Sequence, residues 1–167
     1  MPRKSRLEPA FEPADALIGI ASAMPVHRLI HYINQVTSLS IYRTDELPVF
    51  NEKNESLTYY DFCTCYLEDF RTQVSLVSNN SGNEQLIPAL RQLNYFLMIQ
   101  GSMPEEKIGQ LVTAIKGITG VQLAALVKQE THKELANILQ DLELHLLELK
   151  KKKEEEKRKI MPLSDDQ

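Results

Sequence analysis

Residues 14–23 read ADALIGIASA, and this nearly continuous apolar run decides the fold. Such a run is typical of a strand that is buried on both faces in the middle of a sheet. A second dense apolar run, LNYFLMIQ at residues 93–100, has the same character and predicts a second central strand. The two runs together indicate one sheet built around both strands.

An amphipathic helix is expected after each central strand. Pro25 suits the first turn of a helix, and the apolar positions after it recur at helical spacing: Val26, Leu29, Ile30, Ile33 and Val36. Ser102 precedes Glu105 by three residues, which is the spacing of a capping box, so it is expected to cap the second helix. That helix has its apolar face at Ile108, Leu111, Val112 and Ile115.

Shorter strands are expected between the two central ones. Residues 39–43, LSIYR, predict a strand, and Pro48 with the polar residues 51–56 is expected to interrupt regular structure after it. Residues 57–67 and 70–78 are rich in Tyr, Phe, Thr and Val, and they predict a hairpin.

The predicted elements run β-α-β, hairpin, β-α-β, with the last strand at residues 121–127. This order resembles a ferredoxin-like α+β sandwich built from two β-α-β units with an inserted β-hairpin. The helices of such a sheet lie on one face, so the other face needs a cover. The hairpin, the C-terminal helix or a second subunit could supply it.

A long C-terminal helix is expected over residues 129–160, where Thr131 begins a second capping box with Glu134. Leucines at alternating spacings of four and three form a candidate interaction surface: Leu135, Leu139, Leu142, Leu146 and Leu149. Ile138 and Leu147 widen this stripe, as is expected for packing on a sheet.

The remaining segments divide by composition. Residues 1–13 predict a flexible arm, residues 14–128 the α+β domain, and residues 161–167 a disordered tail. Residues 150–159, KKKKEEEKRK, carry seven bases and three acids. This run has no apolar face and is expected to extend the last helix into solvent.

The charge distribution bears on the class of partner. The net charge is −4, and residues 14–149 carry nine bases against sixteen acids. An acidic body disfavours broad contact with a phosphate backbone, so nucleic acid is not the favoured partner. The basic ends, Arg3 to Arg6 and Lys150 to Lys159, keep an RNA- or ribosome-associated role as the alternative.

Several features predict a cytoplasmic protein. No apolar run reaches the about 18 residues of a membrane span, and no apolar segment directly follows the basic N-terminal residues, so neither a membrane span nor a signal peptide is expected. Cys63 and Cys65 lie too close in sequence for ordinary disulfide geometry and are expected to be reduced thiols.

Candidate chemistry is sparse. His27 and His31, spaced i,i+4 on a helix, would form a four-ligand metal set with Cys63 and Cys65. The two histidines fall opposite the apolar face of their helix, so neither a metal site nor a cofactor is expected. The sequence has no phosphate-binding loop and no recognisable nucleophile–base motif, so it does not predict an enzyme.

Aromatic side chains recur on one predicted strand face, at Tyr60, Phe62 and Tyr66. Such residues can stack RNA bases on an open sheet. Packing against the C-terminal helix or a subunit is the preferred interpretation, because aromatic residues favour half-buried strands.

Residues 86–101, LIPALRQLNYFLMIQG, resemble the signature of the IPExxxVDY family of small bacterial proteins. Three letters match this signature: Ile87, Pro88 and Tyr95. Ala89 and Asn94 stand where the family has acids, and Leu93 stands where it has valine. The resemblance covers about residues 14–128.

The family has no established activity, so the resemblance implies a fold rather than a reaction. Pro88 is expected to hold Ile87 extended, which would bury Ile87 and Leu93 under the sheet, and Asn94 is expected to cap or turn the chain where the family has Asp. We therefore expect a non-enzymatic binding or regulatory module that acts through protein–protein contacts or self-association.

Overall fold

The computed structural model describes residues 16–52, 54–128 and 134–160. The predicted N-terminal arm and C-terminal tail, and the helix start at Thr131, lie outside these ranges. The described helices are α1 (Val26–Val36), α2 (Glu105–Lys116) and α3 (Glu134–Ile160). The described strands are β1 (Ala16–Ser22), β2 (Tyr42–Arg43), β3 (Leu47–Asn51), β4 (Ser56–Tyr60), β5 (Phe62–Leu67), β6 (Thr72–Ser78), β7 (Asn80–Ser81), β8 (Glu84–Gln85), β9 (Tyr95–Gln100) and β10 (Val121–Leu126).

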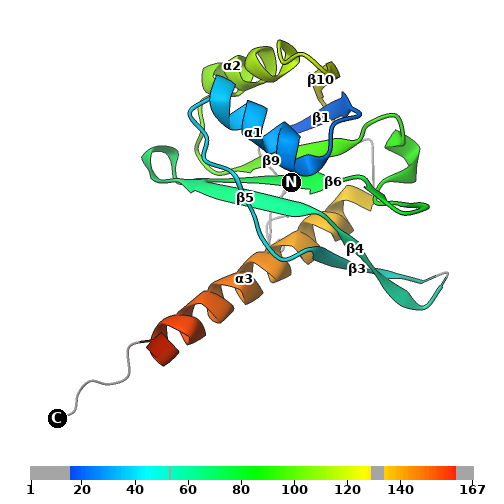
Figure 1. Ribbon diagram of the computed structural model, residues 1–167, viewed down its shortest axis with the longest axis vertical. Coiled ribbons are helices and arrows are strands. Elements are labelled where there is room, and N and C mark those ends of the chain that lie inside the picture. Colours follow the sequence, from blue (N-terminus) through cyan, green and yellow to red (C-terminus); the bar gives the residue numbers. More distant parts are fainter. Residues whose placement is uncertain (1–15, 53, 129–133, 161–167) are drawn as a thin grey trace, which may run out of the picture.

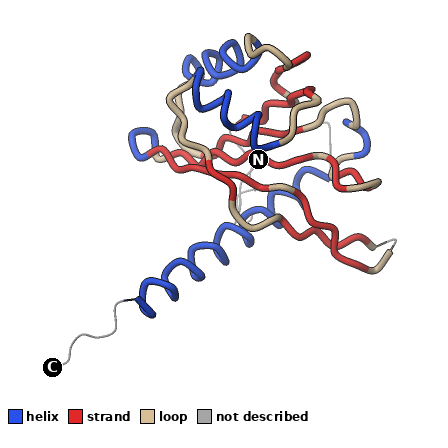
Figure 2. The backbone as a smooth tube through the Cα atoms, viewed as in Figure 1, coloured by secondary structure: helices blue, strands red, loops and turns tan. Residues whose placement is uncertain are grey.

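The main sheet is six-stranded, with the order β10-β1-β9-β6-β5-β2 and antiparallel pairing throughout. β1 and β9 are adjacent interior strands, as the two apolar runs predict. β3 with β4 and β7 with β8 form separate two-stranded sheets. The protein is therefore an α+β protein with an antiparallel main sheet (Figures 1 and 2).

The strand predicted at residues 39–43 is wrong in extent, because β2 comprises Tyr42 and Arg43 alone. Asn34 of α1 explains the difference. Its side-chain amide donates to the carbonyl of Ile41 at 2.9 Å, and its side-chain oxygen accepts from the Ile41 N–H at 2.9 Å. The backbone of Ile41 is thus satisfied by a side chain instead of a neighbouring strand.

The hairpin prediction is also wrong in its boundaries. β5 and β6 pair through a turn at Glu68–Phe70, whereas residues 57–60 belong to β4 and pair with β3. Pro48, expected to interrupt structure, lies inside β3. Among the described strands, β3 pairs with β4 alone, so the missing N–H of Pro48 can face the unpaired edge.

The predicted cap of α2 is wrong as well. The residue at the N-cap position is Pro104, in extended conformation, and it makes no side-chain capping bond. Ser102 lies two positions earlier, after Gly101, whose φ of 146° lies in a region that favours glycine. Pro104 fixes the chain direction immediately before Glu105, so the helix starts too late for Ser102 to cap it.

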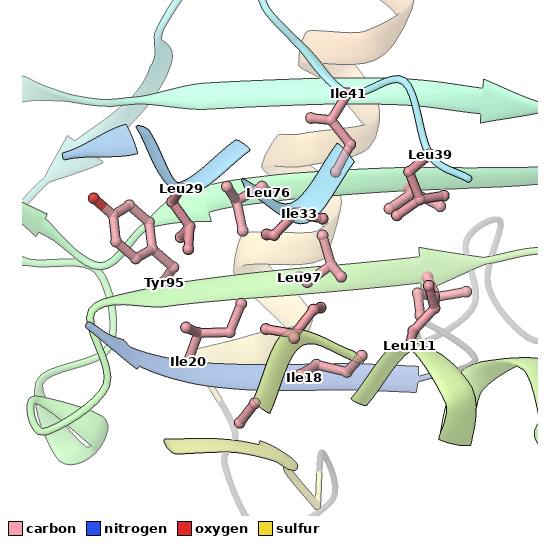
Figure 3. Close-up of a cluster of buried hydrophobic side chains, with 14 of the residues drawn as sticks. Ile18, Ile20, Leu29, Ile33, Leu39, Ile41, Leu76, Tyr95, Leu97 and Leu111 are labelled. Carbon is pink, nitrogen blue, oxygen red and sulfur yellow. The ribbon is translucent and has the colours of Figure 1, made fainter. Parts of the chain in front are cut away.

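α1 and α2 cover one face of the main sheet, which we call the α1/α2 face (Figure 1). Leu29 and Ile33 of α1 pack with Ile18 and Ile20 of β1 and with Leu97 of β9 (Figure 3). All five are fully buried. The helical spacing of α1 predicts this cluster, except that Val36 at the end of the helix is exposed.

α3 and the β3–β4 hairpin cover part of the opposite face, which we call the α3 face (Figure 1). Ile138 and Leu142 of α3 pack with Leu17, Phe62 and Phe96 of the sheet. Ile87, Leu90 and Leu93, from the segment before β9, complete this second cluster. The protein's own C-terminal helix and hairpin therefore supply the cover that the fold needs.

Candidate functional site

The α3 face changes from apolar to polar along its strands. Alternation along β5 puts Phe62, Thr64 and Tyr66 on this face. Their partners across β6 are Val77, Ser75 and Gln73 in the same order. Phe62 and Val77 belong to the buried cluster beneath α3, whereas Tyr66 is exposed.

The polar end of this face is hydrogen-bonded within the sheet. The Thr64 hydroxyl donates to the carbonyl of Val74 at 2.9 Å and lies 3.3 Å from the hydroxyl of Ser75. The amide of Gln73 bonds to Thr64 Oγ1 and, at 3.2 Å, to the carbonyl of Cys65. Both hydroxyl residues are buried, so the floor is polar and hydrogen-bonded within the sheet.

A groove lies where α3 passes this polar end. It has a volume of about 790 Å³. Its floor comprises Thr64, Gln73 and Gln100, and one wall is formed by Leu146 and Leu149 of α3. Tyr42, Tyr66, Leu147, Lys150 and Lys153 also line it. We call this feature the α3 groove.

His145 fixes the position of α3 beside the groove. Its side chain is buried, and its Nε2 atom lies 2.9 Å from the backbone oxygen of Asp45. The imidazole also meets the Phe62 ring edge-on, with 5.1 Å between ring centres. Sequence reasoning missed this residue, although its spacing of three after Leu142 places it on the buried side of the helix.

Two lysines connect α3 to the edge of the sheet. Lys152 Nζ lies 2.7 Å from Asp45 Oδ2, and the hydrogen bond and charge of Lys152 hold the pKa of Asp45 below its usual value. Lys153 Nζ lies 5.6 Å from the ring centre of Tyr42. Beyond these contacts the residues up to Lys159 are exposed, and the helix projects from the body (Figure 1).

The predicted leucine stripe divides between two environments. Leu142 is fully buried against the sheet, and Leu146 and Leu149 are partly buried beside it. Leu147, which we expected to widen the buried stripe, instead lines the α3 groove and is exposed. The side chains of Leu135 and Leu139 lie outside the described part of α3.

The signature residues lie away from the groove, where β1 meets β9. Ile87 is fully buried and Leu93 is buried, as predicted. The Ile87 N–H donates to the side-chain oxygen of Asn79 at 2.7 Å. Pro88 opens a short 3₁₀ turn at Pro88–Leu90 and is exposed.

Asn94 and Tyr95 connect β9 to the end of β1. The side-chain oxygen of Asn94 accepts a hydrogen bond from the Ser22 N–H at 2.8 Å. An aspartate oxygen could accept the same bond, so a structural role of this position does not depend on charge. The Tyr95 hydroxyl donates to the carbonyl of Met24 at 2.6 Å, and burial raises the pKa of Tyr95 to about 12.

The candidate metal residues do not come together. Cys63 and Cys65 are free thiols buried beneath α1, whereas His27 and His31 are exposed. Burial raises the pKa of the Cys63 thiol to about 11. Across residues 16–52, 54–128 and 134–160, no three His, Cys, Asp or Glu side chains form a metal-binding group.

The three aromatic residues predicted on one strand face lie in different environments, because Tyr60 and Phe62 are buried and Tyr66 is exposed at the groove.

Among the helices of the described ranges, none is long and apolar enough to cross a membrane. Comparison with protein-family models, with curated proteins and with solved structures found no match to this chain.

Proposed function

We propose that the protein is a non-enzymatic binding module that holds an extended segment of a partner protein in the α3 groove. The observation that carries this proposal is an exposed aromatic side chain, Tyr66, above a hydrogen-bonded polar floor. Tyrosine is enriched at protein interfaces because it combines a large apolar ring with a polar tip. The wall of α3 opposite it adds Leu146 and Leu149.

The groove chemistry favours an extended segment with one apolar side chain. The amides of Gln73 and Gln100 can bond to a peptide backbone. Lys150 and Lys153 line the same groove together with Glu143 and Glu156, so its charged residues can pair with either sign of charge on the segment. The leucine wall takes the apolar side chain.

The chemistry of the buried residues supports binding over catalysis. The Thr64 hydroxyl is engaged with a backbone carbonyl, and the raised pKa of Cys63 disfavours the thiolate that a nucleophile needs. Both cysteines are free, which supports a reducing, cytoplasmic location.

We also propose the finer fold and family assignment. The order β10-β1-β9-β6 is what a ferredoxin-like sandwich would have, with β5 and β2 added at the edge. Asn94 and Tyr95 bond to Ser22 and Met24 at the end of β1, and Ile87 bonds to Asn79 directly after β6. A relationship to the IPExxxVDY family, with the signature serving the fold, is consistent with those contacts.

Affinity capture from the source cells tests the groove, followed by quantitative mass spectrometry. Tyr66→Glu places a charge at the groove, and Tyr59→Glu is the matched control on the exposed side of β4. We expect a specific partner to be lost with Tyr66→Glu and retained with Tyr59→Glu. A partner set that is identical for both variants would contradict a role for the groove.

An RNA- or ribosome-associated function is the second candidate, because the exposed residues 150–159 are mostly basic. Fluorescence anisotropy with a single-stranded RNA at rising salt separates the two. RNA binding should weaken steeply with salt and decrease when Lys157, Arg158 and Lys159 are replaced by Ala. Binding of a peptide in the groove should tolerate that replacement.

A further inference from the structure

The two edges of the main sheet differ in how they are protected. β2, at one edge, has two residues, Tyr42 and Arg43, and one of them is charged. β10, at the other edge, has six residues and contains no charged residue, proline or glycine. Short length, charge and proline are the usual means of keeping an edge strand from pairing with another chain. β10 has none of them, and its Leu123 and Leu126 are 41% and 59% exposed.

The outer edge of β10 offers a regular row of backbone groups. The Val127 N–H donates to the carbonyl of Leu17 at 2.8 Å, and β10 keeps one register with β1 from Leu123 to Leu126. In an antiparallel pair, successive residues direct their N–H and C=O groups alternately toward the neighbour and away from it. Ala124 and Leu126 therefore direct theirs away from β1, where no other described strand pairs with them.

α2 packs on β10 and presents one side beyond this edge, which we call the outer side of α2 (Figure 1). The opposite side faces α1, because its residues line a hollow together with Val36 at the end of α1: Lys107, Gln110 and Ala114. Helical spacing then gives the outer side an acid at one end and a base at the other: Glu105, Gly109, Val112 and Lys116. A Cβ atom added at Gly109 would meet nothing within 4 Å, so a neighbouring chain can approach closely there.

The middle of α2 lies over the middle of β10. β9 and β10 both pair antiparallel with β1, so they run in the same direction, and α2 returns between them. Glu105 follows the last residue of β9, Gln100, by five residues. Lys116 precedes the first residue of β10, Val121, by five residues. The acidic and basic ends of α2 therefore lie near opposite ends of β10, and one symmetry axis can pass through both elements.

From this geometry we infer that two copies of the chain associate through β10, so that their main sheets form one continuous antiparallel sheet. A two-fold axis at Ala125 pairs Ala124 of each copy with Leu126 of the other, which satisfies the outward N–H and C=O groups of both residues. The same axis sets α2 antiparallel to α2 of the other copy. Glu105 of each copy then faces Lys116 of the other.

The charges of α2 select a second copy over an unrelated strand, which would gain backbone hydrogen bonds alone. In the antiparallel arrangement the acid of each helix meets the base of the other at both ends, and Gly109 opposes Val112 between them. The two copies of Glu105 lie a helix length apart, so like charges of the outer sides do not meet. The association goes beyond the proposed function, because no residue of α2 or β10 lines the α3 groove.

Sedimentation velocity of the full chain over a range of micromolar concentrations tests the association. The wild type should show a concentration-dependent monomer–dimer equilibrium. Leu126→Lys, which adds a charge at the edge, should raise the dissociation constant about tenfold or more. Leu57→Lys, at an exposed leucine of β4, should leave it unchanged. A wild-type monomer at every concentration, or equal effects of the two variants, would overturn the inference.

The groove and the edge have separate readouts in these assays. Leu126→Lys should weaken dimerisation and leave partner capture as in the wild type, whereas Tyr66→Glu should do the reverse. Failure of the groove proposal and failure of the edge proposal therefore give different patterns in the same two variants.

A substitution at Gly109 separates association from folding. Gly109→Gln should keep or raise the melting temperature of the monomer, because glutamine favours a helix and a side chain meets nothing there. The same side chain should clash with Val112 of the other copy and raise the dissociation constant about tenfold or more. A dimer as stable as the wild type would show that the two copies of α2 do not meet.

Disulfide cross-linking tests the register. Ala125 lies at the axis, in a pair whose Cα atoms are about 4.5 Å apart, which a disulfide can span. The single variant Ala125→Cys should therefore form an oxidised dimer. Leu123→Cys should not, because the two copies of Leu123 lie roughly 13 Å apart in this register. The native Cys63 and Cys65 are buried and do not interfere. Cross-linking of Leu123→Cys, or of neither variant, would overturn the register.

Charge reversal tests the choice of a second copy. Glu105→Lys places Lys against Lys at both ends of the α2 pair, and Lys116→Glu places Glu against Glu. Each variant should dimerise more weakly than the wild type, and an equimolar mixture should form a heterodimer in which both ends pair acid with base. Salt should weaken that heterodimer. Variants that dimerise as well alone as in the mixture would show that the charges of α2 do not select the partner.

Discussion

The two faces of the main sheet are covered by different kinds of helix. α1 and α2 each follow a central strand directly, and residues from Ile18 to Ala124 form one continuous buried cluster beneath them. α3 follows the last strand of the sheet and crosses the other face (Figure 1). That face is buried at Phe62 and open at Tyr66, four residues further along the same strand.

The difference shows that the residues on each face of a strand match the helix that covers that face. Cys63 and Cys65 of β5 point to the α1/α2 face and are both buried apolar positions. Phe62, Thr64 and Tyr66 lie on the α3 face and become more exposed along the strand, from the part beneath α3 to the groove. The local helix pair buries the central strands of its face and leaves Leu126 of the edge strand exposed, whereas a single crossing helix covers part of its face and leaves a groove.

The largest test of this comparison removes the cover from one face. A chain truncated after Glu130 loses α3, which exposes Leu17, Phe62 and Phe96 to water. We expect an aggregating or unfolded protein, as measured by light scattering and circular dichroism. Truncation after Leu149 keeps the buried part of α3 and should leave the fold intact. A soluble, folded body without α3 would show that this face needs no cover.

Single side chains test whether the two faces are equally well packed. Leu142→Ala on the α3 face and Ile33→Ala on the α1/α2 face each empty a fully buried position. Each should lower the free energy of unfolding by about 2–5 kcal/mol in denaturant titrations. Leu147→Ala is the exposed control and should change it little. A much smaller effect of Leu142→Ala would mean that α3 is loosely held.

Alkaline pH should affect the α1/α2 face through a buried thiol. The pKa of Cys63 rises from 9.0 to about 11 on folding because burial disfavours the thiolate. The folded state therefore keeps its proton longer than the unfolded state, and stability is full below pH 9 and falls as the pH rises through about 11. Cys63→Ala should flatten that decline in denaturant titrations at several pH values. If Cys63→Ala loses stability with rising pH as much as the wild type does, the loss comes from other groups, such as Tyr95.

The smallest expected effect concerns the ion pair at the edge of the α3 face. Lys152 and Asp45 are both largely exposed, so solvent screens their attraction. Lys152→Ala should leave the melting temperature unchanged within error at physiological salt. His145→Ala, which removes a buried contact to the same residue, should lower it clearly. Equal effects would mean that the exposed pair holds the helix in place.

Sequence periodicity predicts those elements whose apolar pattern lies within one short stretch of the chain. The runs that form β1 and β9, and the apolar spacings of α1 and α2, are such signals. The β3–β4 hairpin escaped prediction, because Pro48 is compatible with a strand when one edge stays unpaired. The strand predicted at residues 39–43 does not include Ile41, because the side chain of Asn34 forms the hydrogen bonds of the Ile41 backbone.

The candidate site was predictable only in part. The leucine spacing of α3 indicates a buried side, yet it does not say how far the helix stays in contact with the sheet. Tyr66 and Gln73 line a groove between the sheet and α3. The path of α3 over the sheet depends on tertiary packing, which the sequence spacing does not give. Only its spacing of three after Leu142 could have indicated His145, since an imidazole by itself is as common on a surface as in a contact.

The pairing of β1 has a consequence for the order in which the chain folds during synthesis. Ser22, at the end of β1, bonds to Asn94 and to Gly120, which lie 72 and 98 residues later. At about 5–20 residues per second, β1 waits several seconds for its neighbours to be made. During that interval a strand as apolar as β1 is prone to pair with the wrong segment. We expect the nascent chain to need protection over that interval, and the finished domain to refold slowly because its central contacts close long loops.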